Sequence, residues 1–328
     1  MVLIGDVGGT KTILALFESG DSGWVCVKRT LYASSKFATF TELLKRFIGD
    51  AGFTITSVCI GVAGPIVNGD CVTTNLPWVL RGKEIGRSVN ASNVWLLNDL
   101  ETTAWGLLGL PDEDFVELNP DAVQSRQGNI AVLAAGTGLG EAIMVWDGVS
   151  HCVIASEGGH ADFAPTDQQQ IDLLKTLMQK YDGHISCERL LSGEGLVNIY
   201  HHLKELQFAP VNSSTEQQML TNDPAAIIGA AGVEGIDELC VEAVNLFCRI
   251  YGAESGNLAL KCLPKAGVYL AGGIAGKILP ALKNGEFMKG FLNKGRSKVV
   301  LEKIPVKVCI NSDAALLGAL RFIDTMIN

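Results

Sequence analysis

A short run of the sequence ends in two polar residues whose types could do chemistry. Residues 94–97 are apolar and predict a buried strand, and Asn98 and Asp99 follow at once, before a helix expected from about Leu100. An aspartate here could begin the helix as its N-cap. It could also accept a proton from a bound hydroxyl, because α/β sheets present ligands at the carboxyl ends of their strands. Alone, the cap is the commoner role, so the choice depends on what accompanies Asp99.

Three glycine-rich turns each follow an apolar strand, and they read VLIGDVGGT, AVLAAGTGLG and VYLAGGIAG. Glycine lets a ligand approach the main chain, and exposed backbone N–H groups attract phosphate oxygens. A tight strand–helix connection would explain one such turn, but three in order favour a phosphate site. The Walker pattern is absent, and GxGxxG is missed because Glu141 follows the run Gly136, Gly138, Gly140.

The composition predicts a globular protein with two domains. The chain has 328 residues, 48% of them hydrophobic and 19% charged, which gives ample core and disfavours disorder. The net charge of −9 argues against nucleic acid or an anionic membrane as the main partner. A bound polyphosphate must therefore be held by local features against an unfavourable overall field.

The cysteines and the hydropathy pattern predict a cytoplasmic protein. The nine cysteines are scattered and form no CxxC pair, which is typical of reduced thiols and makes a zinc site unlikely. The N-terminus lacks a basic segment and Asp6 interrupts its apolar run, so we expect no signal peptide. No apolar stretch is long enough to span a membrane.

The order of the predicted elements indicates two α/β units, each opening with a strand that runs into a glycine turn. A polar loop is expected over residues 110–128, and single helices over 186–206 and 237–263. We place a small domain at residues 1–110, completed by a C-terminal helix at about 311–328. A large domain is expected over 111–310.

Seven blocks of sequence resemble the bacterial glucokinase family of the sugar kinase/actin/Hsp70 ATPase superfamily. They are DVGGTKT, TNLPW, NDLETTAWG, GTGLGEA, SEGGHADFAP, ERLLSGEGLVNIY and VYLAGGI, in family order from residue 6 to residue 274. The related group of repressors and kinases usually carries a cysteine-rich zinc motif, which this chain lacks. The resemblance implies a two-domain actin-like ATPase (ribonuclease H-like) fold with a nucleotide and sugar cleft between the domains, and a homodimer.

The resemblance also implies transfer of the γ-phosphoryl group of ATP to O6 of glucose. Such a transfer needs positioned phosphates, charge neutralisation and an acceptor for the hydroxyl proton, which we assign to Asp99. Asp6 could hold Mg²⁺ through water, although an aspartate there could also stabilise the turn. The residues expected at the phosphates and the adenosine are Gly8, Gly9, Thr10, Gly136, Thr137, Gly138, Gly272 and Gly273.

A neutral hexose requires side chains that donate and accept hydrogen bonds in fixed directions. By resemblance, the residues that contact the sugar are Asn98, Asp99, Glu157, His160 and Glu188, together with Asn75. Two other roles are open: Glu188 could be a surface charge on a helix, and the His–Glu cluster could bind a metal, although no HExxH pattern is present.

Other functions on this fold are open at this point. The enzyme could act on another hexose, such as mannose or an N-acetylhexosamine, because hydroxyl discrimination depends on fine geometry. A non-catalytic sugar sensor should lose the base or the phosphate turns, and both are present. An actin- or Hsp70-like ATPase should lack the set Glu157, His160 and Glu188. Polyphosphate could also fit a glycine cradle as the phosphoryl donor.

Overall fold

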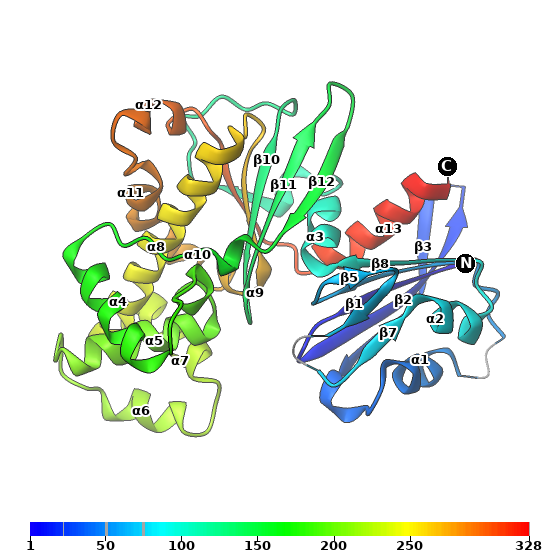
Figure 1. Ribbon diagram of the computed structural model, residues 1–328, viewed down its shortest axis with the longest axis horizontal. Helices are drawn as coiled ribbons and strands as arrows, with labels where there is room; N and C mark the ends of the chain where they lie inside the picture. The colour runs from blue at the N-terminus through cyan, green and yellow to red at the C-terminus, as the bar shows by residue number, and fades with distance from the viewer. Residues whose placement is uncertain (22, 50–51, 74–75, 328) are drawn as a thin grey trace. The chain divides into compact units, whose positions relative to one another are not determined.

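The computed structural model describes residues 1–21, 23–49, 52–73 and 76–327 (Figure 1). Its internal contacts divide the chain into two units. Unit 1 consists of Met1–Pro111 and Asp313–Asn328, and unit 2 consists of Asp112–Ser312. The first unit is therefore completed by the C-terminal segment of the chain.

Unit 1 is built on a five-stranded mixed sheet in the order β3-β2-β1-β4-β8. Strands β1 to β3 form an antiparallel meander, whereas β4 and β8 run parallel to β1. A three-stranded antiparallel sheet, β5-β6-β7, accompanies it. The bounds are β1 (Val2–Val7), β2 (Lys11–Gly20), β3 (Gly23–Ala33), β4 (Ser57–Val62), β5 (Ile66–Val67), β6 (Asp70–Val72), β7 (Val79–Arg81) and β8 (Asn93–Asn98).

Alternating residues of β1 fill two separate cores, one on each face of this sheet. Leu3 packs in a cluster with residues of α1 (Phe40–Ile48) and α2 (Gly82–Val89). Ile4 packs in another cluster with residues of α13 (Ala314–Ile327). Since successive strand residues point to opposite faces, a strand with buried apolar residues on both faces must be covered on both sides.

Helix α3 (Asp99–Leu107) packs closely against α13, and two glycines permit the approach. A Cβ atom on Gly106 would overlap the carbonyl oxygen of Ala314, and one on Gly318 would overlap that of Thr102. Any larger residue would force the helices apart. This contact fixes the helix that begins at Asp99 against the core of unit 1.

Unit 2 repeats the same arrangement in a six-stranded sheet, β12-β11-β10-β13-β14-β9. Strands β10 to β12 form an antiparallel meander, β13 and β14 run parallel to β10, and β9 is antiparallel at the edge. The bounds are β9 (Phe115–Glu117), β10 (Ile130–Ala135), β11 (Leu139–Trp146), β12 (His151–Ser156), β13 (Gly267–Ala271) and β14 (Val306–Cys309).

The core of unit 2 is organised around α8 (Glu238–Cys262), a helix of 25 residues that is largely buried. Helices α5, α7 and α11 pack directly against it. Within the described ranges, no helix is both long and apolar enough to cross a membrane. The remaining helices are α4 (Gln168–Lys180), α5 (Gly193–Glu205), α6 (Ser213–Met219), α7 (Pro224–Glu234), α9 (Gly272–Ala275), α10 (Leu279–Leu282), α11 (Glu286–Leu292) and α12 (Lys298–Leu301).

Two local predictions from the sequence are wrong. The expected helix over 186–206 is broken: a 3-10 turn, η4 (Cys187–Arg189), precedes α5, and Ser192 begins α5 as its N-cap. Leu190 and Leu191, in the segment between η4 and the Ser192 cap, are completely buried. The expected polar loop over 110–128 contains β9, because Phe115 and Val116 pair with β14.

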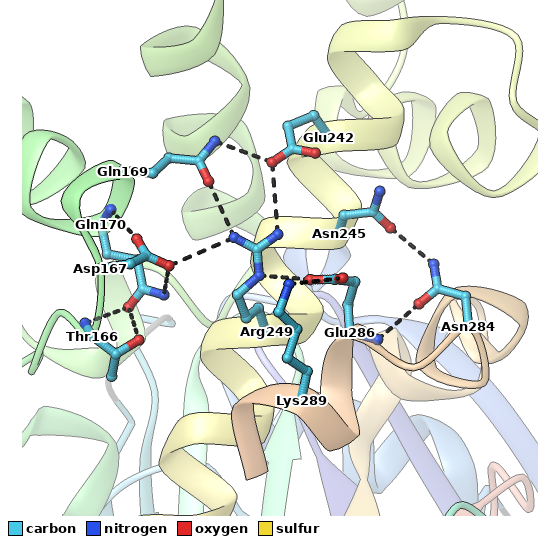
Figure 2. A network of polar contacts seen from close by, with 10 residues as sticks. All are labelled: Thr166, Asp167, Gln169, Gln170, Glu242, Asn245, Arg249, Asn284, Glu286 and Lys289. Atoms are coloured by element: carbon cyan, nitrogen blue, oxygen red, sulfur yellow. Dashed lines mark hydrogen bonds and ion pairs between the residues drawn. The ribbon is translucent and has the colours of Figure 1, made fainter. Parts of the chain in front are cut away.

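A polar network around Arg249 ties three helices of unit 2 together (Figure 2). The guanidinium of Arg249, on α8, lies 2.6 Å from a Glu286 oxygen on α11 and 3.7 Å from an oxygen of Asp167, the N-cap of α4. Glu242 and Gln169 complete its surroundings at 3.9 and 3.2 Å. Only 17% of the Arg249 side chain is exposed, so these carboxylates depend on it for compensation.

We predict that Arg249→Met lowers the free energy of unfolding by about 2–4 kcal/mol, because it takes the Arg249 cation from Asp167 and Glu242 and leaves Glu286 to the exposed Lys289. Urea unfolding followed by circular dichroism measures the change. Lys298→Met is the matched control: it removes an exposed i,i+4 partner of Glu302 and should cost less than about 0.5 kcal/mol. Equal losses in the two variants would contradict the assignment.

Candidate active site

The first glycine turn joins β1 to β2 in unit 1 and contains Gly8, Gly9 and Thr10. The Gly8 N–H donates to the Lys11 carbonyl at 2.9 Å and closes the turn. Ser34, which is fully buried, supports it from the end of β3. Its hydroxyl donates to the Gly8 carbonyl at 2.9 Å, and its N–H donates to the Thr10 carbonyl at 3.0 Å. The sequence offered no signal for Ser34, because the contact joins two distant segments.

Asp6 lies near the end of β1, where its environment disfavours a negative charge. Its pKa is raised to about 6, chiefly by burial and further by the charges of Asp99 and Asp313. Arg29 binds the Asp313 carboxylate at 2.7 Å. Three carboxylates that repel one another are a place where a cation is stabilising. This environment fits the hydrated Mg²⁺ that the sequence predicted at Asp6.

No preformed metal cage accompanies Asp6. In the part of the chain that the structure describes, no cluster of three or more His, Cys, Asp or Glu side chains could hold a metal ion. Mg²⁺ differs from zinc in this respect, because it keeps several water ligands and often binds through one or two carboxylates and the substrate's phosphates. The donor set around Asp6 is of that sparse kind.

Asn98 and Asp99 both contact the start of α3. Asn98 ends β8 and is the N-cap of α3; its side-chain oxygen and Oδ1 of Asp99 each accept the N–H of Leu100 at 2.9 Å. Asp99 is the first residue of that helix. In the sheet register Val7 pairs with Val62, and Val62 pairs with Asn98. The end of β8 and the end of β1 therefore lie at the same edge of the sheet, two strands apart.

The other two glycine turns adjoin each other in unit 2. Gly136, Thr137 and Gly138 connect β10 to β11, with the Gly136 N–H bonded to the Gly138 carbonyl at 2.8 Å. Gly272 follows β13, the parallel neighbour of β10, and begins α9 before Gly273. Its φ is +82°, and a Cβ there would overlap the carbonyl oxygen of Ala135. Position 272 therefore requires glycine, and the two turns lie side by side at one edge of the sheet.

The predicted sugar ligands of unit 2 come together on two short 3-10 turns. Glu157 and His160 flank or lie on η3 (Gly158–His160), and Glu188 lies on η4. The two ring nitrogens of His160 lie 3.8 Å from a Glu157 oxygen and 4.0 Å from a Glu188 oxygen. Exposure of the side chains falls from 72% at Glu157 to 28% at Glu188. Two acceptors and an imidazole are thus presented from a partly enclosed surface.

Backbone pairing holds these two turns side by side. The N–H of Phe163 donates to the Ile185 carbonyl, and the N–H of Cys187 donates to the Ala161 carbonyl, both at 2.9 Å. A further side-chain contact joins the same segments, with Nε2 of His184 2.8 Å from an Asp162 oxygen. The sequence did not single out this pair. The predicted sugar ligands Glu157, His160 and Glu188, called the sugar set below, are therefore positioned by main-chain hydrogen bonds. They do not depend on the long side-chain contacts among themselves.

Glu188 also connects the sugar set to the second glycine turn. Its Oε2 accepts the backbone N–H of Leu139 at 2.9 Å, directly after Gly138. A Cβ on Gly138 would collide with that same oxygen. The alternative role of Glu188 as a surface charge on a helix is wrong, because the residue lies in η4 and its carboxylate is engaged by β11.

Asn75, the remaining sugar residue predicted from the sequence, lies outside the described residues. Thr10 and Thr137 are exposed on their turns, as expected of groups that meet a ligand. The structure therefore presents one group of predicted residues in each unit. Unit 1 holds Asp6, the first turn, Asn98 and Asp99, and unit 2 holds the other two turns and the sugar set.

Comparison with known proteins shows the family of the chain. A family model described as Glucokinase matches residues 3–326. Proteins named Glucokinase from Nostoc punctiforme and Synechocystis are 39% and 40% identical to it, over 97% of this chain and 97% and 96% of theirs. The crystal structure of glucokinase from an Antarctic psychrotroph superposes with a TM-score of 0.82 at 26% identity, covering 99% of this chain and 98% of that one.

This likeness confirms the actin-like ATPase fold class expected from the sequence. It is carried by similarity along nearly the whole chain and does not depend on one motif. The matching segment includes both units and every glycine turn described above. The chain belongs to the glucokinase family.

Proposed function

We propose that this protein is a glucokinase, which transfers the γ-phosphoryl group of Mg-ATP to O6 of glucose and yields glucose 6-phosphate and ADP. The observation that carries the proposal is the bond between Glu188 and the Leu139 N–H. It joins the sugar ligands of unit 2 to a phosphate turn, as a sugar kinase requires. Family membership supports the same activity.

The sugar is bound by Glu157, His160 and Glu188 in unit 2 and by Asn98 and Asp99 in unit 1. Carboxylate oxygens accept hydrogen bonds from hydroxyl groups, and the imidazole can donate one and accept another. Asn98 uses its side-chain oxygen to cap α3, which orients the amide that binds the sugar. Asn75 is proposed as a further contact on the strength of its sequence motif alone.

The phosphates are held mainly by main-chain N–H groups of the glycine turns. The chain has a net charge of −9, so its overall field repels a nucleotide. Turns that expose N–H groups supply local positive potential without basic side chains. Gly8, Gly9, Thr10, and residues 136–138 contact the phosphates, and Gly272 and Gly273 approach the adenosine.

Asp99 accepts the proton of the attacking hydroxyl. O6 of glucose bonds to the γ-phosphorus, the bond from that phosphorus to the β–γ bridging oxygen breaks, and the O6 proton passes to the Asp99 carboxylate. Asn98 is the N-cap of α3 and the Asp99 carboxylate accepts the same N–H of Leu100, a contact that an amide at position 99 could keep. Asp6 would hold Mg²⁺ through water, and the ion would supply positive charge that neutralises the phosphates of the nucleotide.

The cellular setting also remains a proposal. All nine cysteines are free thiols, which fits a reducing compartment such as the cytoplasm. The homodimer stays a prediction from the family resemblance.

The decisive experiment is an assay of ADP release over a panel of glucose, mannose and N-acetylglucosamine, repeated with ATP and polyphosphate as donors. ATP turnover that is independent of sugar would overturn the proposal.

Asp99→Asn should lower kcat by about 100-fold or more while the KM for glucose changes little, because the amide cannot accept the proton. Steady-state kinetics measure both constants. Glu84→Gln is the matched control: it removes an exposed carboxylate from the same unit and should leave kcat unchanged. Near-normal turnover in Asp99→Asn would return Asp99 to a structural role.

His160→Asn should raise the KM for glucose by about tenfold, since one hydrogen bond to the sugar is lost in a partly enclosed site. The KM for ATP should change much less. His151→Asn, on β12 of the same unit, is the control, because the described contacts of that ring are a hydrogen bond with the Gly128 carbonyl and a ring contact with Trp146. A parallel rise in both KM values would indicate general damage to unit 2.

The Mg²⁺ requirement should depend on pH through Asp6. With a pKa of about 6, its carboxylate is mostly protonated at pH 5.5 and ionised at pH 7.5. The free Mg²⁺ concentration for half-maximal activity should therefore be about fourfold higher at the lower pH. Asp6→Asn should need more Mg²⁺ at both pH values and lose this difference. Asp21→Asn, in a turn of the same unit, should behave like the unmodified protein.

A further inference from the structure

Beneath the sugar set of unit 2 lies a buried carboxyl group that the proposed mechanism does not use. Glu141 is on β11, immediately after the second glycine turn, and is only 1% exposed. Among the described residues its Oε1 has no hydrogen-bond partner. An ionised carboxylate without a partner at a buried position is strongly destabilising. Protonation of the Glu141 carboxyl group would remove this cost.

Glu141 touches the segment that carries Glu157 and His160. A Cβ built on Gly158 would collide with the Glu141 carboxylate, which shows that the carboxylate lies directly against this glycine. The Glu141 carbonyl accepts the hydroxyl of Ser156 at 2.8 Å, and that hydroxyl oxygen accepts the N–H of Gly158 at 3.2 Å. The carboxylate and the backbone carbonyl of Glu141 thus both contact the segment from Ser156 to Gly158, at the start of η3.

A second buried carboxyl group, Glu254 on α8, is linked to the other sugar turn. It is 6% exposed, and its Oε2 lies 3.4 Å from the Cys187 sulfur of η4 and 2.9 Å from the Asn257 amide. Cys187 immediately precedes Glu188. The two sugar-binding turns therefore each rest on one member of an acidic pair.

Burial and the neighbouring Glu254 oppose the ionisation of Glu141. Glu254, Tyr251 and the exposed Lys261 on α8, together with the Cys187 thiol on η4, are the ionisable groups that interact with Glu141. The pKa of Glu141 is raised to about 7, first by burial and then by Glu254, while Lys261 opposes the shift. Glu141 is therefore protonated below neutral pH and ionised above it.

We propose that Glu141 is a positioning residue for glucose: its neutral form holds η3 and η4 in the binding arrangement, and its ionisation against Glu254 displaces them. This inference rests on the proposed function, since it assigns the glucose site to those turns. The proton exchanges with solvent, and no other reactant is needed. Glucose should bind more weakly as the pH rises through neutrality, whereas the chemical step at Asp99 is unaffected.

The test compares the KM for glucose of the unmodified protein and of Glu141→Gln between pH 6 and 8.5. Glutamine has the shape of the neutral acid and cannot ionise. The ratio of the two KM values cancels every titration that the proteins share. We expect the KM of the unmodified protein divided by the KM of Glu141→Gln to rise by about threefold or more from pH 6 to pH 8.5, with a midpoint near pH 7. The corresponding ratio of kcat values should not change in parallel. A flat ratio would overturn the inference.

Two further variants keep the test decisive even if Glu141→Gln folds poorly. Glu254→Gln removes the neighbouring charge, so the midpoint of the KM profile should move to lower pH. Glu302→Gln removes an exposed carboxylate and should leave the profile unchanged. A KM profile that is the same in Glu254→Gln and the unmodified protein would count against the acidic pair.

A readout other than activity follows from linkage. Because folding raises the pKa of Glu141, the folded state binds more protons than the unfolded state, and stability falls as the pH rises from about 4.5 to about 7. Glu141→Gln should therefore melt at a higher temperature than the unmodified protein at pH 8, with a smaller difference at pH 5. An equal difference at both pH values would overturn the assigned titration. Absence of glucose turnover at every pH would instead overturn the proposed function, and this inference with it.

Discussion

The bond from the Leu139 N–H to the Glu188 carboxylate is the contact on which the site of unit 2 depends. It joins a residue assigned to the sugar with the turn assigned to phosphate, and it does so through the main chain of β11. A side chain at Gly138 would collide with the same carboxylate oxygen, so the turn needs glycine for this contact as well as for a ligand. The same stretch of chain thus positions residues that we assign to two different substrates. Leu139 and Glu141 lie on the same strand, β11, and contact Glu188 of η4 and Gly158 of η3 respectively. A shift of β11 would therefore move both 3-10 turns.

The two units repeat a sheet with the strand order 3-2-1-4-5, and that order explains where the polar residues lie. Parallel strands end at one edge of a sheet, and the loops beyond them can reach a ligand. In unit 1, β1 and β8 bring Asp6 and Asn98 to this edge. In unit 2, β10 and β13 bring two glycine turns there. The buried strands need only be apolar and of matching length, which leaves the chemistry to a few residues at their ends.

The sequence predicted those strand ends well because each depends on a local pattern: an apolar run, then glycine or a carboxylate. It also predicted His160, Glu157 and Glu188, but only through resemblance to known blocks. What it could not predict depends on contacts between distant segments. Ser34 supports the first turn from the end of β3, and β9 forms because Phe115 finds a partner on β14. The break before α5 exists because Leu190 and Leu191 are buried in the core, which helical periodicity alone does not reveal.

Acidic groups are placed in this protein where burial and neighbours oppose their ionisation, and this has a common consequence in both units. Around Asp6 the proposed Mg²⁺ would relieve the repulsion from Asp99 and Asp313, so the metal and the nucleotide bound to it would be favoured together. Around Glu141 the cation named among the interacting groups is Lys261, which is exposed and opposes the pKa shift only in part. Protonation of Glu141 therefore relieves the repulsion from Glu254. The same physics thus couples one unit to metal and the other to pH. An acidic chain can bind anionic ATP because its carboxylates recruit the positive charge that the ligand also requires.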